Sequence, residues 1–71
     1  GEVGAEAKYN IAYILFLKEQ FETSNLEINE LTNNYSSYKD WVTKGFLLMS
    51  DNFVKLGDYF QAKYILKSIL I

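Results

Sequence analysis

The 71-residue sequence contains no cysteine, no histidine and no proline. Without cysteine there can be no disulfide, and the usual thiol nucleophile, imidazole base and zinc ligands are also missing. The acidic residues of segment 19–30 alternate with polar side chains, as on a solvated helix face. We therefore expect neither an enzymatic activity nor a cofactor. The absence of proline leaves long helices possible.

The sequence also lacks a large excess of one charge sign and long apolar runs. Seven lysines stand against nine acidic residues, and this net charge of −2 lacks the basic stripe that nucleic-acid binding requires. The longest apolar run, residues 11–17, is much shorter than the roughly 18 residues of a membrane span. The chain begins with Gly1, and we expect it to be a fragment of a longer protein.

What the chain does contain is apolar residues at helical spacing. The sequence is 49% hydrophobic and 17% aromatic, enough for one small folded domain. Apolar and small residues recur every three or four positions, which predicts four helices near residues 4–18, 21–34, 39–56 and 59–70. For the first helix we expect a buried face around Ala12 made of Ala7, Ile11, Ile14 and Leu15.

The predicted turns differ in how strongly the sequence specifies them. Gly57 suits the left-handed backbone that ends a helix, and Asp58 can accept the first free amides of the next helix. The segment 18–21 has neither glycine nor aspartate at this place. Between these turns, residues 33–38 read as a polar loop, and Asp40 is a candidate cap for the third helix.

The two halves of the chain correspond when the first is shifted by 38 residues. Apolar residues then fall on apolar residues and small ones on small ones, although identities hardly recur. This recurrence of side-chain class predicts an internal duplication of a helix–turn–helix unit. The pairs are Ile11 with Met49, Ala12 with Ser50, Leu15 with Phe53, Phe21 with Tyr59, Ser24 with Ala62, Ile28 with Leu66 and Leu31 with Ile69.

Such a duplicated helix pair, with small residues at Ala12 and Ser24 and at Ser50 and Ala62, resembles the tetratricopeptide repeat (TPR) family. The stretch LGDYFQAK is also similar to that family's link between helices. Three features depart from the family pattern: the step of 38 residues rather than 34, a first turn without glycine, and no proline after a unit. The opening segment AEAKYNIAYILFL also looks similar to bacterial cell-envelope proteins with such repeats.

The resemblance implies an all-α fold in a single domain, residues 1–71. Its two helix–turn–helix repeats, about 5–36 and 43–71, would form four antiparallel helices stacked as part of a right-handed superhelical α-solenoid. The implied function is a protein–protein interaction scaffold, and the implied location is the bacterial cell envelope. The resemblance also implies that the first and third helices line a concave face that binds a protein or peptide. The expected binding residues are Tyr9, Asn10, Tyr13, Phe16, Lys44, Leu48, Asp51 and Lys55.

Two alternatives stay open. Tyr9, Tyr13 and Phe16 would also serve a purely structural role by packing on one another, and Trp41 is better explained as a packing anchor than as a ligand platform. The other alternative is a structural self-assembly unit, because repeat arrays need their terminal apolar faces covered by further repeats or by a second copy. The residues expected to mediate self-association are Tyr64, Ile65, Ile69, Leu70 and Ile71.

Overall fold

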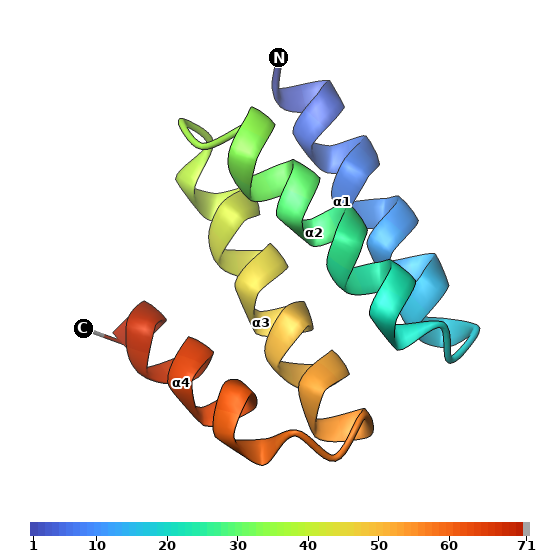
Figure 1. Ribbon diagram of the computed structural model, residues 1–71. Helices are drawn as coiled ribbons and strands as arrows, with labels where there is room; N and C mark the ends of the chain where they lie inside the picture. The colour runs from blue at the N-terminus through green and yellow to red at the C-terminus, as the bar shows by residue number, and fades with distance from the viewer. Residues whose placement is uncertain (71) are drawn as a thin grey trace.

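The computed structural model describes residues 1–70, and within them it contains four α-helices and no strand. The helices are α1 (Glu2–Leu17), α2 (Phe21–Asn34), α3 (Lys39–Lys55) and α4 (Tyr59–Leu70) (Figure 1). The expected all-α fold is thus confirmed, with helix ends within two residues of the predicted ones. No helix among the described residues combines the length and the apolarity needed to cross a bilayer.

The helices form a slab whose Cα atoms extend over 33 × 31 × 14 Å. The chain turns back at each of its three connections, and α4 lies on the far side of α3 from α1 and α2 (Figure 1). Helix α3 is central, since it packs against α1, α2 and α4, whereas α4 packs against α3 alone. Within residues 1–70, one long side of α4 is therefore left without a neighbouring helix.

The hydrophobic core draws on every helix. Gly45 lets α3 approach α2 closely, because a Cβ built there would lie 2.9 Å from Leu31 Cδ2 and 3.3 Å from Ile28 Cγ2. Burial of such side chains stabilises the fold by roughly 1.5–3 kcal/mol each. The central cluster comprises Ala12, Ile28, Leu48, Met49 and Ile65, and the partly buried Tyr9, Phe16, Phe46, Phe53 and Ile69 pack against it.

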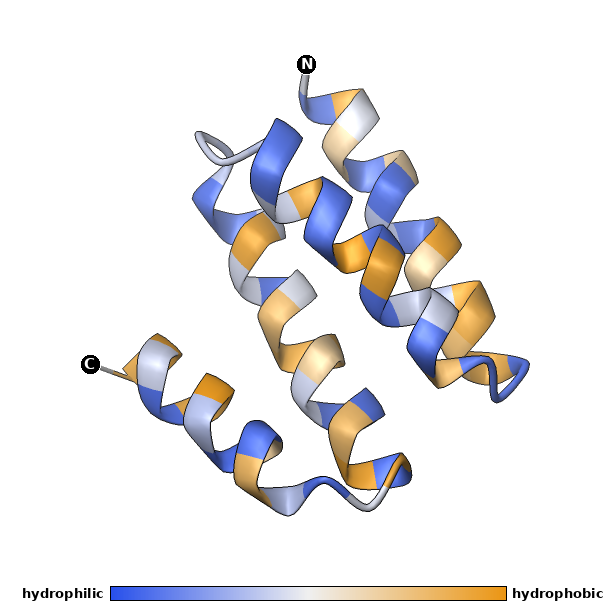
Figure 2. Cartoon of the chain, viewed as in Figure 1, coloured by the Kyte–Doolittle hydropathy of each residue, from blue (hydrophilic) through white to orange (hydrophobic). Residues whose placement is uncertain are grey.

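The face predicted for the first helix is wrong in part. Ala5 and Ala12 are the buried residues of α1, whereas Ala7, Ile11 and Ile14 are exposed. The reason is that residues 11–17 are apolar all round the helix, so their spacing does not select one face. Figure 2 shows this hydrophobic concentration in the C-terminal half of α1.

The two helix–helix turns have the same backbone geometry. Glu19 in the first and Gly57 in the second, which are 38 positions apart, both have positive φ, 61° and 79°. The amides of Gln20 and Asp58 donate to carbonyls five residues earlier, at 2.9 and 2.8 Å. The first turn thus adopts with glutamate the conformation that the second adopts with glycine. This agreement makes the fold repeat-like.

The caps differ from one helix to the next. The carboxylate of Asp58 accepts a hydrogen bond of 3.1 Å from the Gln61 amide, which confirms its predicted role before α4. The prediction that Asp40 caps the third helix is wrong. Helix α3 already begins at Lys39, with Tyr38 at the N-cap position and no side-chain cap, and Asp40 lies in the first turn.

Candidate functional site: an aromatic surface on α1 and α3

A row of aromatic rings runs along one side of α1. Tyr9, Tyr13 and Phe16 are four and three residues apart, so the helix aligns them. The Tyr9 and Tyr13 ring centroids are 6.3 Å apart and the Tyr13 and Phe16 centroids 6.2 Å apart, with nearly parallel planes. Phe21, at the start of α2, meets Phe16 edge-on at 5.7 Å. We call Trp41, Tyr9, Tyr13, Phe16 and Phe21 the aromatic row.

Trp41 extends this row from α1 onto α3. Its ring centroid lies 5.7 Å from that of Tyr9, and Lys44 Nζ lies 4.6 Å from the centre of the tryptophan ring. Each aromatic contact of this kind contributes about 0.5–1.5 kcal/mol beyond the area it buries. The row therefore fixes α1 on α3. It also presents a surface, because Tyr13 is 43% exposed and Tyr9 and Phe16 are partly exposed.

The environment of Tyr9 is both apolar and negative. Burial raises the pKa of the Tyr9 phenol above its usual value, and the neighbouring Tyr13 and the carboxylate of Asp51 raise it further. Asp51 is exposed on α3. The surface thus combines flat aromatic rings with a cation at Lys44 and an anion at Asp51.

The structure brings together most of the residues expected to bind a partner, but not all. Tyr9, Tyr13 and Phe16 form the row, with Lys44 and Asp51 beside it. Leu48 does not belong to this surface, because it is 4% exposed and lies in the core. Asn10 and Lys55 are exposed and make no side-chain hydrogen bond or ion pair within residues 1–70.

Sequence reasoning missed two members of the row. The sequence identifies Phe21 only as the counterpart of Tyr59 in the duplication, and Trp41 only as a packing anchor. Both are placed by tertiary contacts, Trp41 with Tyr9 and Phe21 with Phe16. The sequence signal for both is an aromatic residue in the first turn of a helix, Phe21 after the first turn of the chain and Trp41 after the polar loop.

A buried polar network links α1, α2 and α3. The Asn52 amide donates to Ser24 Oγ at 2.8 Å and to Asn25 Oδ1 at 2.9 Å, and the Ser24 hydroxyl donates to the Ala12 carbonyl at 2.7 Å. Asn52 is fully buried, and its Oδ1 has no hydrogen-bond partner among the described residues. In the second unit the Ser50 hydroxyl donates to the Ala62 carbonyl at 3.2 Å. Each serine therefore joins the two helices of its pair by a hydrogen bond at the point where small residues let the helices approach closely.

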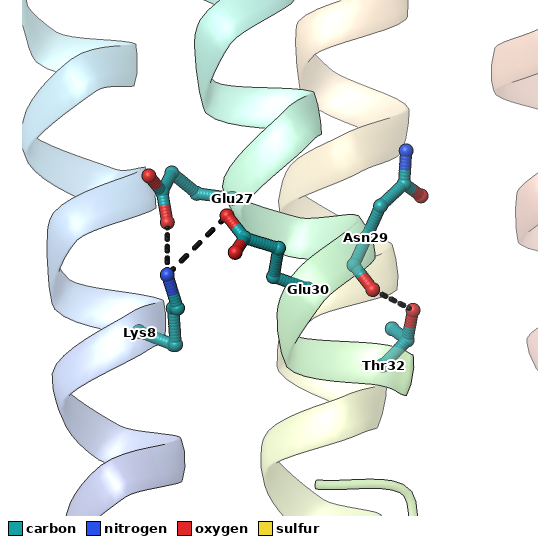
Figure 3. A network of polar contacts seen from close by, with 5 residues as sticks. All are labelled: Lys8, Glu27, Asn29, Glu30 and Thr32. Carbon is teal, nitrogen blue, oxygen red and sulfur yellow. Dashed lines mark hydrogen bonds and ion pairs between the residues drawn. The ribbon is translucent and has the colours of Figure 1, made fainter. Parts of the chain in front are cut away.

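An ion-pair cluster lies on another side of α1 (Figure 3). Lys8 Nζ is 2.8 Å from Glu27 Oε2 and 3.3 Å from Glu30 Oε2, both on α2. The hydrogen bond to Glu27 is the main cause that raises the pKa of Lys8, with Glu30 adding to it and burial opposing it. Two of the acidic residues expected to be solvated thus connect α2 to α1, and the cluster has a structural role.

A cleft of about 510 Å³ lies between α2 and the α3–α4 turn. Its lining residues are Glu22, Asn25, Leu26, Phe53, Leu56 and Asp58. The carboxylates of Glu22 and Asp58 are the only ionisable groups among these lining residues. No group of three or more potential metal ligands occurs within residues 1–70.

The residues expected to mediate self-association divide into two groups. Tyr64 and Leu70 are exposed on α4. Ile65 is buried in the core and Ile69 packs against it, so these two hold α4 on α3. Ile71 lies outside the described residues.

We compared the chain with protein-family models, curated proteins and solved structures, and none of the three comparisons finds a match.

Proposed function

We propose that the chain is a protein–protein interaction module that binds a peptide or protein partner on the aromatic row. The observation that carries the proposal is the arrangement of the exposed ring of Tyr13 and the partly exposed rings of Tyr9 and Trp41 across two helices, flanked by Lys44 and Asp51. Tyrosine and tryptophan offer large contact areas with few rotamers to immobilise, which is why they dominate binding hot spots. The chemistry of the surface suits an extended peptide with apolar side chains.

The proposed architecture is the one that the TPR resemblance implies, two antiparallel helix pairs stacked as part of an α-solenoid. It is supported by the matching hydrogen bonds of the two turns and by the serine bridges at both crossings. It is also supported by the order of contacts, in which α3 packs on α1 and α2 as well as on its own partner α4. A binding role is favoured over catalysis because the sequence has neither histidine nor cysteine.

Selection from a displayed library of random peptides tests the proposed function. Peptides enriched on the wild-type chain should lose at least about tenfold in affinity for Tyr13→Ala, as expected when a hot-spot aromatic is truncated. Tyr64→Ala is the matched control, because it removes an exposed tyrosine on α4. Enriched peptides that depend on Tyr64 and not on Tyr13 would contradict the proposal. Circular dichroism of both variants should match the wild type.

A second candidate function is self-assembly. It is favoured by α4, where Tyr59, Phe60, Tyr64 and Leu70 are all exposed and where, among the described helices, only α3 packs. Exposed apolar patches of this kind mark association surfaces in soluble proteins. Sedimentation of the wild-type chain over a range of concentrations tests this candidate, and a monomer throughout would exclude it.

A further inference from the structure

The described part of the chain, residues 1–70, has two unpartnered apolar faces, one on its first helix and one on its last. On α1, Val3, Ile11 and Ile14 are exposed; on α4, Tyr59, Leu66 and Leu70 are exposed. Neither face belongs to the aromatic row. We call them the α1 face and the α4 face.

The shift of 38 residues shows what the α1 face corresponds to. It places Ala7, Ile11 and Ile14 on Gly45, Met49 and Asn52 of α3. Those three residues are buried, and Gly45 and Asn52 contact residues of α2. Ile11 and Ile14 are 45% and 51% exposed, whereas Met49 and Asn52 are 7% and 0% exposed. The α1 face is thus the counterpart of a buried face whose covering helix is α2.

The same shift applies to the α4 face. It places Leu66 on Ile28 of α2, and Lys63 on Asn25. Ile28 is fully buried beside Gly45 of α3, whereas Leu66 is 39% exposed. At Leu66 and Lys63 the α4 face is therefore the counterpart of the α2 surface that α3 covers. The two exposed faces match the two sides of the α2–α3 junction inside the molecule.

A junction between the α1 face and the α4 face would bury no side-chain amide that lacks a hydrogen-bond partner. In the α2–α3 junction the buried polar contact is made by Asn52 with Ser24 and Asn25. The shifted positions hold Ile14 on the α1 face, and Ala62 and Lys63 on α4. An isoleucine would pack against an alanine and against the lysine stem, whose ammonium group can reach water.

The charges of the two ends are complementary. Helix α1 carries two glutamates and one lysine, whereas α4 carries two lysines and no acidic residue. Contact between the α1 end of one copy and the α4 end of another brings opposite charges together, whereas contact between two like ends does not. The charge distribution therefore favours a head-to-tail arrangement.

We propose that the α4 face of one copy of this chain docks on the α1 face of a second copy, in the way that α2 packs on α3. This inference rests on self-assembly, the second candidate function. The contact is heterologous, so each added copy leaves one α1 face and one α4 face free, and association is open-ended. The occupant of each face is the other face of an identical chain.

A complementation experiment tests the head-to-tail contact. Ile14→Glu places a carboxylate on the α1 face, and Leu66→Glu places one on the α4 face. Either change should weaken self-association at least about tenfold, because an unpaired buried carboxylate is strongly unfavourable. Each variant alone should sediment as a monomer. An equimolar mixture should form a one-to-one dimer and no larger species, because one intact face of each kind remains.

The control is Leu26→Glu, which changes an exposed leucine on α2 outside both faces and should associate as the wild type does. Circular dichroism shows whether each variant is folded. If the Ile14→Glu variant alone still dimerises, the contact joins two α4 faces, and the head-to-tail arrangement is wrong while self-assembly stands. If the wild-type chain is a monomer at every concentration, both are wrong. Neither result bears on peptide binding by the aromatic row.

Discussion

Replacing Glu19 by glycine should stabilise the chain. Glu19 has a φ of 61°, and Gly57, its counterpart in the second turn, has a φ of 79°. A residue with a Cβ in the left-handed conformation costs roughly 1–2 kcal/mol, and glycine avoids this cost. Glycine also makes the unfolded chain more flexible, which offsets about 0.4–1 kcal/mol of the gain in stability. The net gain for Glu19→Gly should be about 0.5–1 kcal/mol.

The reverse change, Gly57→Ala, should destabilise the chain by a similar amount. A Cβ at Gly57 would meet no atom within 4 Å, so only the backbone conformation is changed. Thermal and urea denaturation followed by circular dichroism measure both effects. In a domain of this size 1 kcal/mol corresponds to roughly 4–8 °C in Tm. Glu19→Ala is the control, because it removes the carboxylate and keeps a Cβ.

The reasoning would be refuted by two results together: no gain in Glu19→Gly and no loss in Gly57→Ala. A gain in Glu19→Ala as large as in Glu19→Gly would assign the effect to charge instead of to backbone strain.

Three further predictions concern the interior and the surface. Ser24→Ala should lower the free energy of unfolding by about 1–3 kcal/mol, measured by urea denaturation. The loss should exceed that of Ser50→Ala, because the Ser24 hydroxyl also accepts a hydrogen bond from the buried Asn52 amide. Equal losses for the two variants would contradict this. Gly45→Ala should destabilise by up to about 2 kcal/mol in the same assay, because the strain of its Cβ against buried Leu31, about 1–3 kcal/mol, exceeds the roughly 1 kcal/mol gained in helix propensity. A variant about 1 kcal/mol more stable than the wild type would mean that the α2–α3 contact relaxes freely. The pKa of the Tyr9 phenol is raised on folding, so the stability that this group contributes is present below its unfolded pKa of about 10. That stability is lost as the pH rises through the higher pKa of the folded state. Tyr9→Phe should therefore flatten the fall in the free energy of unfolding at alkaline pH. An unchanged alkaline slope would refute the assignment to Tyr9.

The sequence predicts much of this fold because the helices carry regular signals. Residues 21–34 and 59–70 match the predicted helices, and the cap at Asp58 follows from a local Gly-Asp pair. The orientation of α1 could not be predicted in the same way. Its C-terminal half is apolar on all sides, and only packing against α2 and α3 decides that Ala12 is buried and Ile14 exposed.

The candidate site could be predicted only in outline. The spacing of Tyr9, Tyr13 and Phe16 places three rings on one side of a helix. The burial of Leu48 beside exposed Leu47 could not be read from spacing, because two adjacent leucines compete for the core. The buried contacts of Asn52 gave no signal at all, since asparagine is usually exposed and its partners lie on another helix.

The central claim is that a partner binds on the aromatic row, and the single tryptophan provides the most direct measurement. The indole N–H of Trp41 gives one NMR resonance, and its ring lies against Tyr9 within the row. Addition of a library-selected peptide should shift this resonance in the wild-type chain and leave it unmoved in Tyr13→Ala at the same peptide concentration. A Trp41 resonance that stays in place while the amides of α4 shift would contradict the account.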